Sequence, residues 1–145
     1  MAGAVTVTVT VTVERRLAAP PESVFDAWLD PEGLGQWLFR TPTGALERVE
    51  VDPRIGGRFR VDERRDGEIA AHHGEYVELD RPRRLAFDFW TSFSDVRTRV
   101  TLDIAPDGDG AMLTLTHDGV WPDWADKTAQ GWTMILDGLA RHLAP

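Results

Sequence analysis

The C-terminal segment constrains the fold most, because residues 123–143 carry one amphipathic helix pattern after a long run of strand-like sequence. At about 100° per residue, the apolar side chains of the segment fall on a single wide stripe. The stripe holds Trp124, Ala125, Thr128, Trp132, Ile135, Leu136, Leu139 and Leu143, and the opposite side holds Asp126, Lys127, Gln130, Asp137 and Arg141. A curved antiparallel sheet matches such a helix in length. We therefore expect a sheet that curls around the helix and encloses apolar space in which small molecules bind.

Near the N-terminus, residues 5–17 alternate with a period of two, valines on one side and threonines on the other. This alternation predicts the first strand. The threonine–valine repeat specifies its register weakly. We therefore expect residues 1–9 to extend past the sheet or to pair with another chain.

Two short helices are predicted after this strand. Pro20 and Pro21 end the strand and open a helix in which the apolar side chains near Trp28 share one face. Asp30 then reads as an N-cap, with Pro31 at the first position of a second helix. That second helix carries Leu34, Trp37 and Leu38.

From residue 46 the sequence predicts six strands joined as a meander. The turns are marked by residues 56–57, 66–67, 80–82, 92–95 and 107–110, which are rich in Gly, Asp and Pro. By parity, the apolar face holds Val49, Val51, Phe59, Val61, Val77, Leu79, Leu85, Phe87, Phe89, Val96, Val100, Leu102, Ile104, Leu113 and Leu115. Charged residues fill the opposite face. The prediction is an α+β fold, in which seven antiparallel strands curve around a long C-terminal helix and two short helices lie between strands one and two.

The composition fits one domain over residues 1–145 and excludes several classes of protein. With 16 basic and 24 acidic residues the net charge is −8, so nucleic acid is not an expected partner. There is no cysteine, which excludes disulfides and thiolate chemistry. The N-terminus does not resemble a signal peptide, and about 18 apolar residues never run together, so we expect a cytoplasmic protein without a membrane partner.

The common catalytic and metal-binding motifs are absent from the sequence. His72 and His73 are adjacent in a predicted strand, so their side chains leave opposite faces and cannot share one metal. The Asp-Gly run at residues 107–110 lacks the ligand spacing of a calcium loop and is explained as a hairpin turn. No metal and no cofactor are expected.

Four titratable side chains are predicted to point toward the apolar interior. By parity, His73 and Glu75 lie with Val77 and Leu79, His117 lies with Leu113 and Leu115, and Arg15 lies with Val13 and Leu17. One interpretation is that Arg15 and Glu75 neutralise each other or reach water, and that the histidines are simply hydrogen-bonded. The other is that Arg15, Glu75 and His117 orient a ligand, because a buried charge without a partner costs several kcal/mol.

Two glycines and one tryptophan in the C-terminal part also invite a functional interpretation. Gly131 and Gly138 lie seven residues apart on one flank of the long helix, where each costs up to about 1 kcal/mol relative to alanine. They indicate either a close contact with a neighbouring strand or room left for a ligand. Trp121, beside Pro122 in the loop before the helix, is the candidate for a residue at the mouth of a cavity.

Five blocks of sequence carry a family resemblance. They read APPESVFDAWLDPEGLGQWL, VEVDPRIGGRFRV, GEYVELDRPRRLAFDFW, TRVTLDIAPDGDGAMLTLTHDGV and GWTMILDGLARHL, and the resemblance that they carry runs from about Val11 to Leu143. In this order they resemble the START-like (SRPBCC) helix-grip superfamily, and within it the family similar to the activator of heat-shock protein 90 ATPase. The chain departs from that pattern at Trp37-Leu38, where the family often has paired tryptophans.

The resemblance implies a binding function more than a particular reaction. Related proteins bind lipids, polyketides and hormones, cyclise aromatic rings, or sequester reactive natural products. The co-chaperone that gives the family its name has a further N-terminal domain for which this chain has no room, so chaperone binding is not expected. The leading hypothesis is therefore a protein that binds a hydrophobic or aromatic small molecule between the sheet and the C-terminal helix.

The expected ligand site combines the apolar residues around the long helix with the inward-pointing polar ones. Its members are Arg15, Trp37, Phe59, His73, Glu75, Phe87, Phe89, His117, Trp121, Trp132 and Leu136. Two other classes of function remain open. One is a cyclase or hydrolase in which His117, Glu75 or Arg15 moves protons. The other is a protein-interaction module, such as a co-chaperone or a homodimer formed through the strand edge near residues 5–12.

Overall fold

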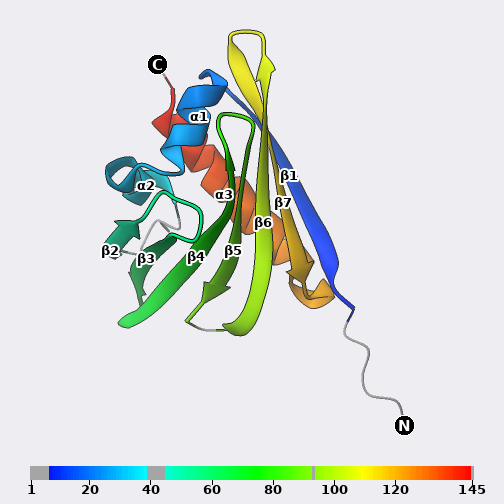
Figure 1. Cartoon of the computed structure of the whole chain (residues 1–145). Helices are drawn as coiled ribbons and strands as arrows, with labels where there is room; N and C mark the ends of the chain where they lie inside the picture. Colours follow the sequence, from blue (N-terminus) through cyan, green and yellow to red (C-terminus); the bar gives the residue numbers. More distant parts are fainter. Residues whose placement is uncertain (1–6, 39–44, 93, 145) are drawn as a thin grey trace.

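Figure 1 shows the computed structural model, which describes residues 7–38, 45–92 and 94–144 as a curved sheet with a long helix along its hollow face. The strands are β1 Val9–Leu17, β2 Ala45–Val51, β3 Arg58–Arg65, β4 Glu68–Asp80, β5 Arg84–Thr91, β6 Ser94–Asp107 and β7 Gly110–Val120. The helices are α1 Pro21–Ala27, α2 Pro31–Trp37 and α3 Ala125–His142, with a single 3-10 turn, η1, at Pro122–Trp124. The predicted α+β architecture is confirmed.

The seven strands form one antiparallel sheet in the order β1-β7-β6-β5-β4-β3-β2. β1 and β2 are therefore its two edges, and each of the other strands has two hydrogen-bonded neighbours. α3 packs against β1, and α2 packs against both β2 and α3 (Figure 1). The predicted first strand begins at Val9, while Val5 and Thr6 lie outside the described residues.

The local signals for turns and helix starts are confirmed. β3 and β4 are joined by Asp66 and Gly67 at φ +50° and +83°, the left-handed conformation that a two-residue hairpin turn needs. The Asp30 carboxylate accepts a hydrogen bond from the Glu32 N–H at 3.1 Å, which caps α2 as predicted. The segment before α3 differs from the prediction, because Pro122–Trp124 form a 3-10 turn and leave Trp124 55% exposed instead of on the buried stripe.

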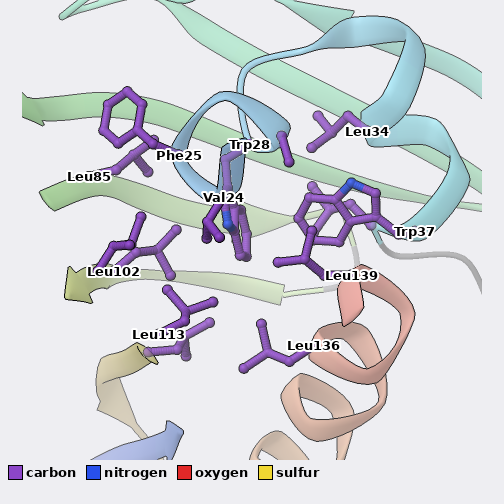
Figure 2. Packing of buried hydrophobic residues seen from close by; sticks show 14 of the residues in the cluster. Val24, Phe25, Trp28, Leu34, Trp37, Leu85, Leu102, Leu113, Leu136 and Leu139 are labelled. Atoms are coloured by element: carbon purple, nitrogen blue, oxygen red, sulfur yellow. The ribbon is translucent and has the colours of Figure 1, made fainter. Parts of the chain in front are cut away.

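The hydrophobic core lies between the sheet and the three helices. Figure 2 shows Val24 from α1, Trp28 just after α1, and Trp37 from α2 near Leu136 and Leu139 from α3. All of these side chains are buried, as are the leucines of the central strands beneath them. The residues of α3 that are buried thus come from the middle of the predicted apolar stripe. Burial of each such leucine stabilises the fold by about 1.5–3 kcal/mol.

The predicted inner face of β4 is wrong for its first half. The pairing register shifts between Tyr76 and Glu78, which places a β-bulge at Val77. Gly74 and Tyr76 pair with the core residues Phe89 and Phe87, so Gly74 and Tyr76 face the core. The prediction assumed strict alternation from Leu79 back to His73, and the bulge interrupts that alternation. His73 and Glu75 were therefore predicted to face the core, although they lie on the outer face of the sheet.

The two helical glycines have different surroundings. A Cβ atom on Gly138 would lie 3.5 Å from the Trp37 carbonyl oxygen, so this glycine faces α2 and not a strand. A Cβ atom on Gly131 would have no heavy atom within 4 Å among the described residues. The predicted close contact with a strand is therefore wrong for both positions.

Gly131→Ala is expected to stabilise the protein. Alanine is better than glycine in a helix interior by about 0.8–1 kcal/mol, and the space around Gly131 accepts the methyl group without a clash. Urea unfolding should show a higher midpoint with an unchanged slope. Gly138→Ala is the matched comparison, and a gain of similar size is expected, because its methyl group would meet Trp37 only at ordinary van der Waals distance. A lower midpoint for Gly131→Ala would contradict this account.

Candidate functional site

A cavity of about 450 Å³ lies where the ends of β5, β6 and β7 meet η1 and the start of α3. The strands β5 and β6 contribute Phe89, Trp90, Thr91, Val96 and Thr98 to its lining. The end of β7, the turn after it and α3 contribute His117, Gly119, Val120, Trp121, Trp124 and Thr128. The cavity therefore combines aromatic and apolar walls with a few uncharged polar groups, which is the usual composition of a small-molecule site.

The mouth of the cavity is aromatic. Trp121 and Trp124 line the cavity and are 42% and 55% exposed. The Lys127 ammonium lies 5.1 Å from the centre of the Trp124 ring, close enough for a cation–π contact. Trp121 thus lies where a mouth residue was expected.

His117 is the buried polar centre of the cavity wall. Its side chain is directed inward from β7 and is 6% exposed. The Trp132 indole N–H donates a hydrogen bond to His117 Nδ1 at 2.9 Å. On the other side of the ring, His117 Nε2 lies 2.7 Å from Thr98 Oγ1. Thr98 Oγ1 in turn donates to the Phe89 carbonyl oxygen at 3.3 Å.

These contacts fix the charge state and tautomer of His117. An indole N–H only donates, so Nδ1 must be an acceptor, and the ring carries its proton on Nε2. Burial lowers the pKa of His117 from 6.5 to about 4, so the neutral form dominates at neutral pH. Trp132 and Thr98 therefore hold a neutral imidazole in one orientation.

Five of the predicted site residues lie in the packed core. The main hydrophobic cluster contains Trp37, Phe59, Phe87, Trp132 and Leu136, and none of them lines this cavity. The rings of Phe59 and Phe87 meet edge to face with their centres 5.0 Å apart. Aromatic pairs of this geometry fill core volume well. The middle of the sheet–helix interface is thus occupied by side chains, and the cavity lies toward one end.

Three of the predicted polar residues lie away from the cavity. Arg15 is 46% exposed and pairs with Asp137 of α3 at 3.6 Å, on the helix side of the sheet edge. Glu75 pairs with Arg58 at 3.1 Å and with Arg97 at 3.9 Å on the outer face. Because β1 and β4 are separated by three strands, the expected Arg15–Glu75 pair is wrong.

His73 takes part in an aromatic stack on the outer face of the sheet. Its ring stacks on Trp90 with the ring centres 5.6 Å apart and the planes 6° apart. The guanidinium of Arg97 lies 4.0 Å from the centre of the same indole. These groups, together with Glu75, form a surface network in which the charges are already paired. An isolated exposed ion pair is typically worth only about 0–1 kcal/mol.

The sequence interpretation missed a second buried histidine, His72. It faces the interior, is 4% exposed, and its Nδ1–H donates to the Val61 carbonyl oxygen at 3.2 Å. Burial lowers the pKa of His72 to about 4. Its ring stacks against Phe89, with the ring centres 6.4 Å apart, and so packs behind the cavity wall. The alternation of His72, Gly74 and Tyr76 was the available signal, but it requires knowledge of the bulge.

Thr98, Thr128 and Val120 were also missed as lining residues. Thr98 shares the face of Val96 and Val100 by parity, so its inward direction was available from the sequence. Thr128 was placed on the apolar stripe of the C-terminal helix without a role. Val120 and Gly119 lie in the last residues of β7, where a strand pattern gives no indication of a cavity.

Within residues 7–38, 45–92 and 94–144, no group of three or more His, Asp or Glu side chains is arranged to hold a metal ion. None of the helices in these ranges is long and apolar enough to cross a membrane.

Several solved structures share this fold. Protein CV1439 from Chromobacterium violaceum is 29% identical, with a TM-score of 0.84 over 94% of this chain and 98% of the other. CalU16 from Micromonospora echinospora is 27% identical, with a TM-score of 0.71 over 95% and 78% of the two chains. Protein Mll3558 from Rhizobium loti, at 22% identity and a TM-score of 0.81, covers 94% and 98% and shows the fold alone.

No curated protein matches the sequence significantly. The family model described as "Activator of Hsp90 ATPase homolog 1-like protein" matches residues 18–144, which is most of the chain. The match includes every helix and all strands except β1. The chain therefore belongs to the family of Activator of Hsp90 ATPase homolog 1-like proteins.

Proposed function

We propose that this protein binds an apolar or aromatic small molecule in the cavity between the end of the sheet and the start of α3. The observation that carries the proposal is the cavity itself, whose volume of about 450 Å³ is that of a small-molecule site. Phe89, Trp121 and Trp124 offer aromatic surface to the ligand. His117 and Thr98 supply uncharged polar groups at the inner wall.

The position of the cavity also supports binding. It opens beside η1, at the end of the sheet away from α1 and α2, where the exposed rings of Trp121 and Trp124 form its rim. A ligand can therefore enter without displacing the core cluster around Leu136. An aromatic rim favours contact with a ring-bearing molecule.

The state of His117 favours binding over proton-transfer catalysis. A general base at neutral pH works best with a pKa near 7, whereas burial lowers the pKa of His117 to about 4. The lone pair of Nδ1 is occupied by the Trp132 N–H, and Nε2 is engaged with Thr98. His117 is thus suited to be a fixed, neutral part of the wall of a binding site.

Binding is expected to be abolished by filling the cavity. The neutral fluorescent probe N-phenyl-1-naphthylamine should bind the wild-type protein with increased emission. Val96→Trp places an indole in the cavity and should weaken this binding by roughly tenfold or more, because the probe loses its space and its contacts. Fluorescence titration measures both dissociation constants.

Met134→Trp is the matched control. Met134 is 57% exposed on α3 and does not line the cavity, so the added indole should leave probe binding unchanged. Thermal melts of both variants establish that they are folded. Equal binding by wild type and Val96→Trp would overturn the assignment of the site.

A further inference from the structure

The two polar side chains of the inner cavity wall, His117 and Thr98, have used all of their hydrogen-bond donors. Trp132 donates to His117, the Nε2–H of His117 donates to Thr98, and the Thr98 hydroxyl donates to the Phe89 carbonyl oxygen. This series of hydrogen bonds can run in only one direction, because the Trp132 indole at its start cannot accept a hydrogen bond. His117 and Thr98 therefore keep no hydrogen with which to bind an acceptor group of a ligand.

The described lining also carries no formal charge. It contains no Asp, Glu, Lys or Arg, and its histidine is neutral. Three cations lie near the described lining, and all are already engaged. Arg58 and Arg97 lie over the Trp90 ring and pair with Glu75 at 3.1 and 3.9 Å. Lys127 lies over Trp124 at the mouth.

A charged ligand group placed against this wall would lose its hydration without compensation. Burying an ion without a partner costs several kcal/mol, and leaving an acceptor unpaired costs about 1–3 kcal/mol. An uncharged aromatic group incurs neither cost and gains contacts with the surrounding rings.

We propose that the cavity selects uncharged aromatic ligands and rejects their anionic congeners, because the His117–Thr98 wall has no free donor and no charge. This inference rests on the proposed function and adds the charge class of the ligand. It assigns Trp132 and Thr98 a positioning role, since they hold His117 in the tautomer that leaves the wall without a donor.

Two probes that differ by one group test this selectivity. N-phenyl-1-naphthylamine is neutral, and 8-anilinonaphthalene-1-sulfonate has the same rings with an added sulfonate. The wild-type protein should bind the sulfonate roughly tenfold more weakly or worse, as measured by fluorescence titration at pH 7. Equal or tighter binding of the sulfonate at the site blocked by Val96→Trp overturns the inference and leaves the proposed function intact. If neither probe binds the wild-type protein, the proposed function itself is contradicted.

Thr98→Val provides a second, independent test. It removes the acceptor of the His117 Nε2–H and so returns one free donor to the wall. The preference for the neutral probe, measured as the ratio of the two dissociation constants, should then decrease by roughly threefold or more. Thr116→Val, on the opposite face of the neighbouring strand, should leave the ratio at its wild-type value. An unchanged ratio in folded Thr98→Val would show that the wall does not set the selectivity.

Discussion

Replacing Gly74 with alanine is expected to destabilise the protein by about 3 kcal/mol, a large effect for a single methyl group. A Cβ atom on Gly74 would lie 1.9 Å from Cε2 of Phe59 and 2.4 Å from its Cζ. The Phe59 ring lies over the bare backbone of Gly74 in the adjacent strand. Urea unfolding measures the loss as a lower midpoint with an unchanged slope.

The Phe59 ring cannot easily move aside to accept the methyl group. It is 3% exposed and contacts Phe87 edge to face, with the Tyr76 ring on another side at 5.8 Å between ring centres. A double-mutant cycle isolates the cause. If the clash is responsible, Gly74→Ala in a Phe59→Leu background should cost less than about 1 kcal/mol. An equal cost in both backgrounds would point to the backbone of β4 instead.

Much of the fold was predictable because its signals are local. The Asp66-Gly67 turn requires positive φ at both residues, and the Asp30-Pro31 pair begins a helix through one side-chain hydrogen bond. The buried middle of α3 followed from helical periodicity, with Trp132 and Leu136 on its inner side. Each of these features depends on residues within a few positions of one another.

The faces of β4 were not predictable, because a β-bulge depends on the partner strand. The bulge at Val77 changes the parity between Tyr76 and Leu79, and nothing in the local pattern marks it. His73 and Glu75 were therefore placed inside, whereas His72 is the buried histidine. Gly74 was the overlooked signal, since a glycine in a strand often marks the close approach of another group.

The residues that line the candidate site were only partly predictable. Phe89, His117 and Trp121 were assigned from parity or from their place in the chain, and all three line the cavity. Trp37 and Leu136 were assigned from their apolar character, which serves core packing and ligand binding equally well. Which apolar residues leave space depends on how side chains from distant elements fill the interior.

Acid is expected to unfold the protein between about pH 6.5 and 4, well above the range in which ordinary carboxylates titrate. His72 and His117 have their pKa values lowered from 6.5 to about 4 by burial. In the unfolded chain both take up a proton near pH 6.5, whereas in the folded protein both remain neutral down to about pH 4. The unfolded state therefore binds more protons in this window, and stability falls as the pH falls.

The expected loss is large compared with the stability of a typical domain. Each histidine contributes on the order of 3 kcal/mol over the full window, so the two together contribute on the order of 6 kcal/mol, which already lies within the 5–15 kcal/mol range of domain stabilities. The free energy of unfolding in urea should therefore be constant above about pH 7 and fall steeply toward pH 4. Asp26, whose pKa is lowered by its hydrogen bond and ion pair with Arg81, adds to the loss only at lower pH.

Single substitutions separate the two histidines from the carboxylates. His117→Gln and His72→Gln should each be less stable than the wild type at pH 7, because each loses native hydrogen-bond geometry. Between pH 6.5 and 4, however, the stability of each variant should fall about half as steeply as that of the wild type, since one of two proton-binding groups is gone. A slope that is unchanged in both variants would mean that other groups control acid unfolding, and the neutral state of His117 in the cavity wall would lose its support.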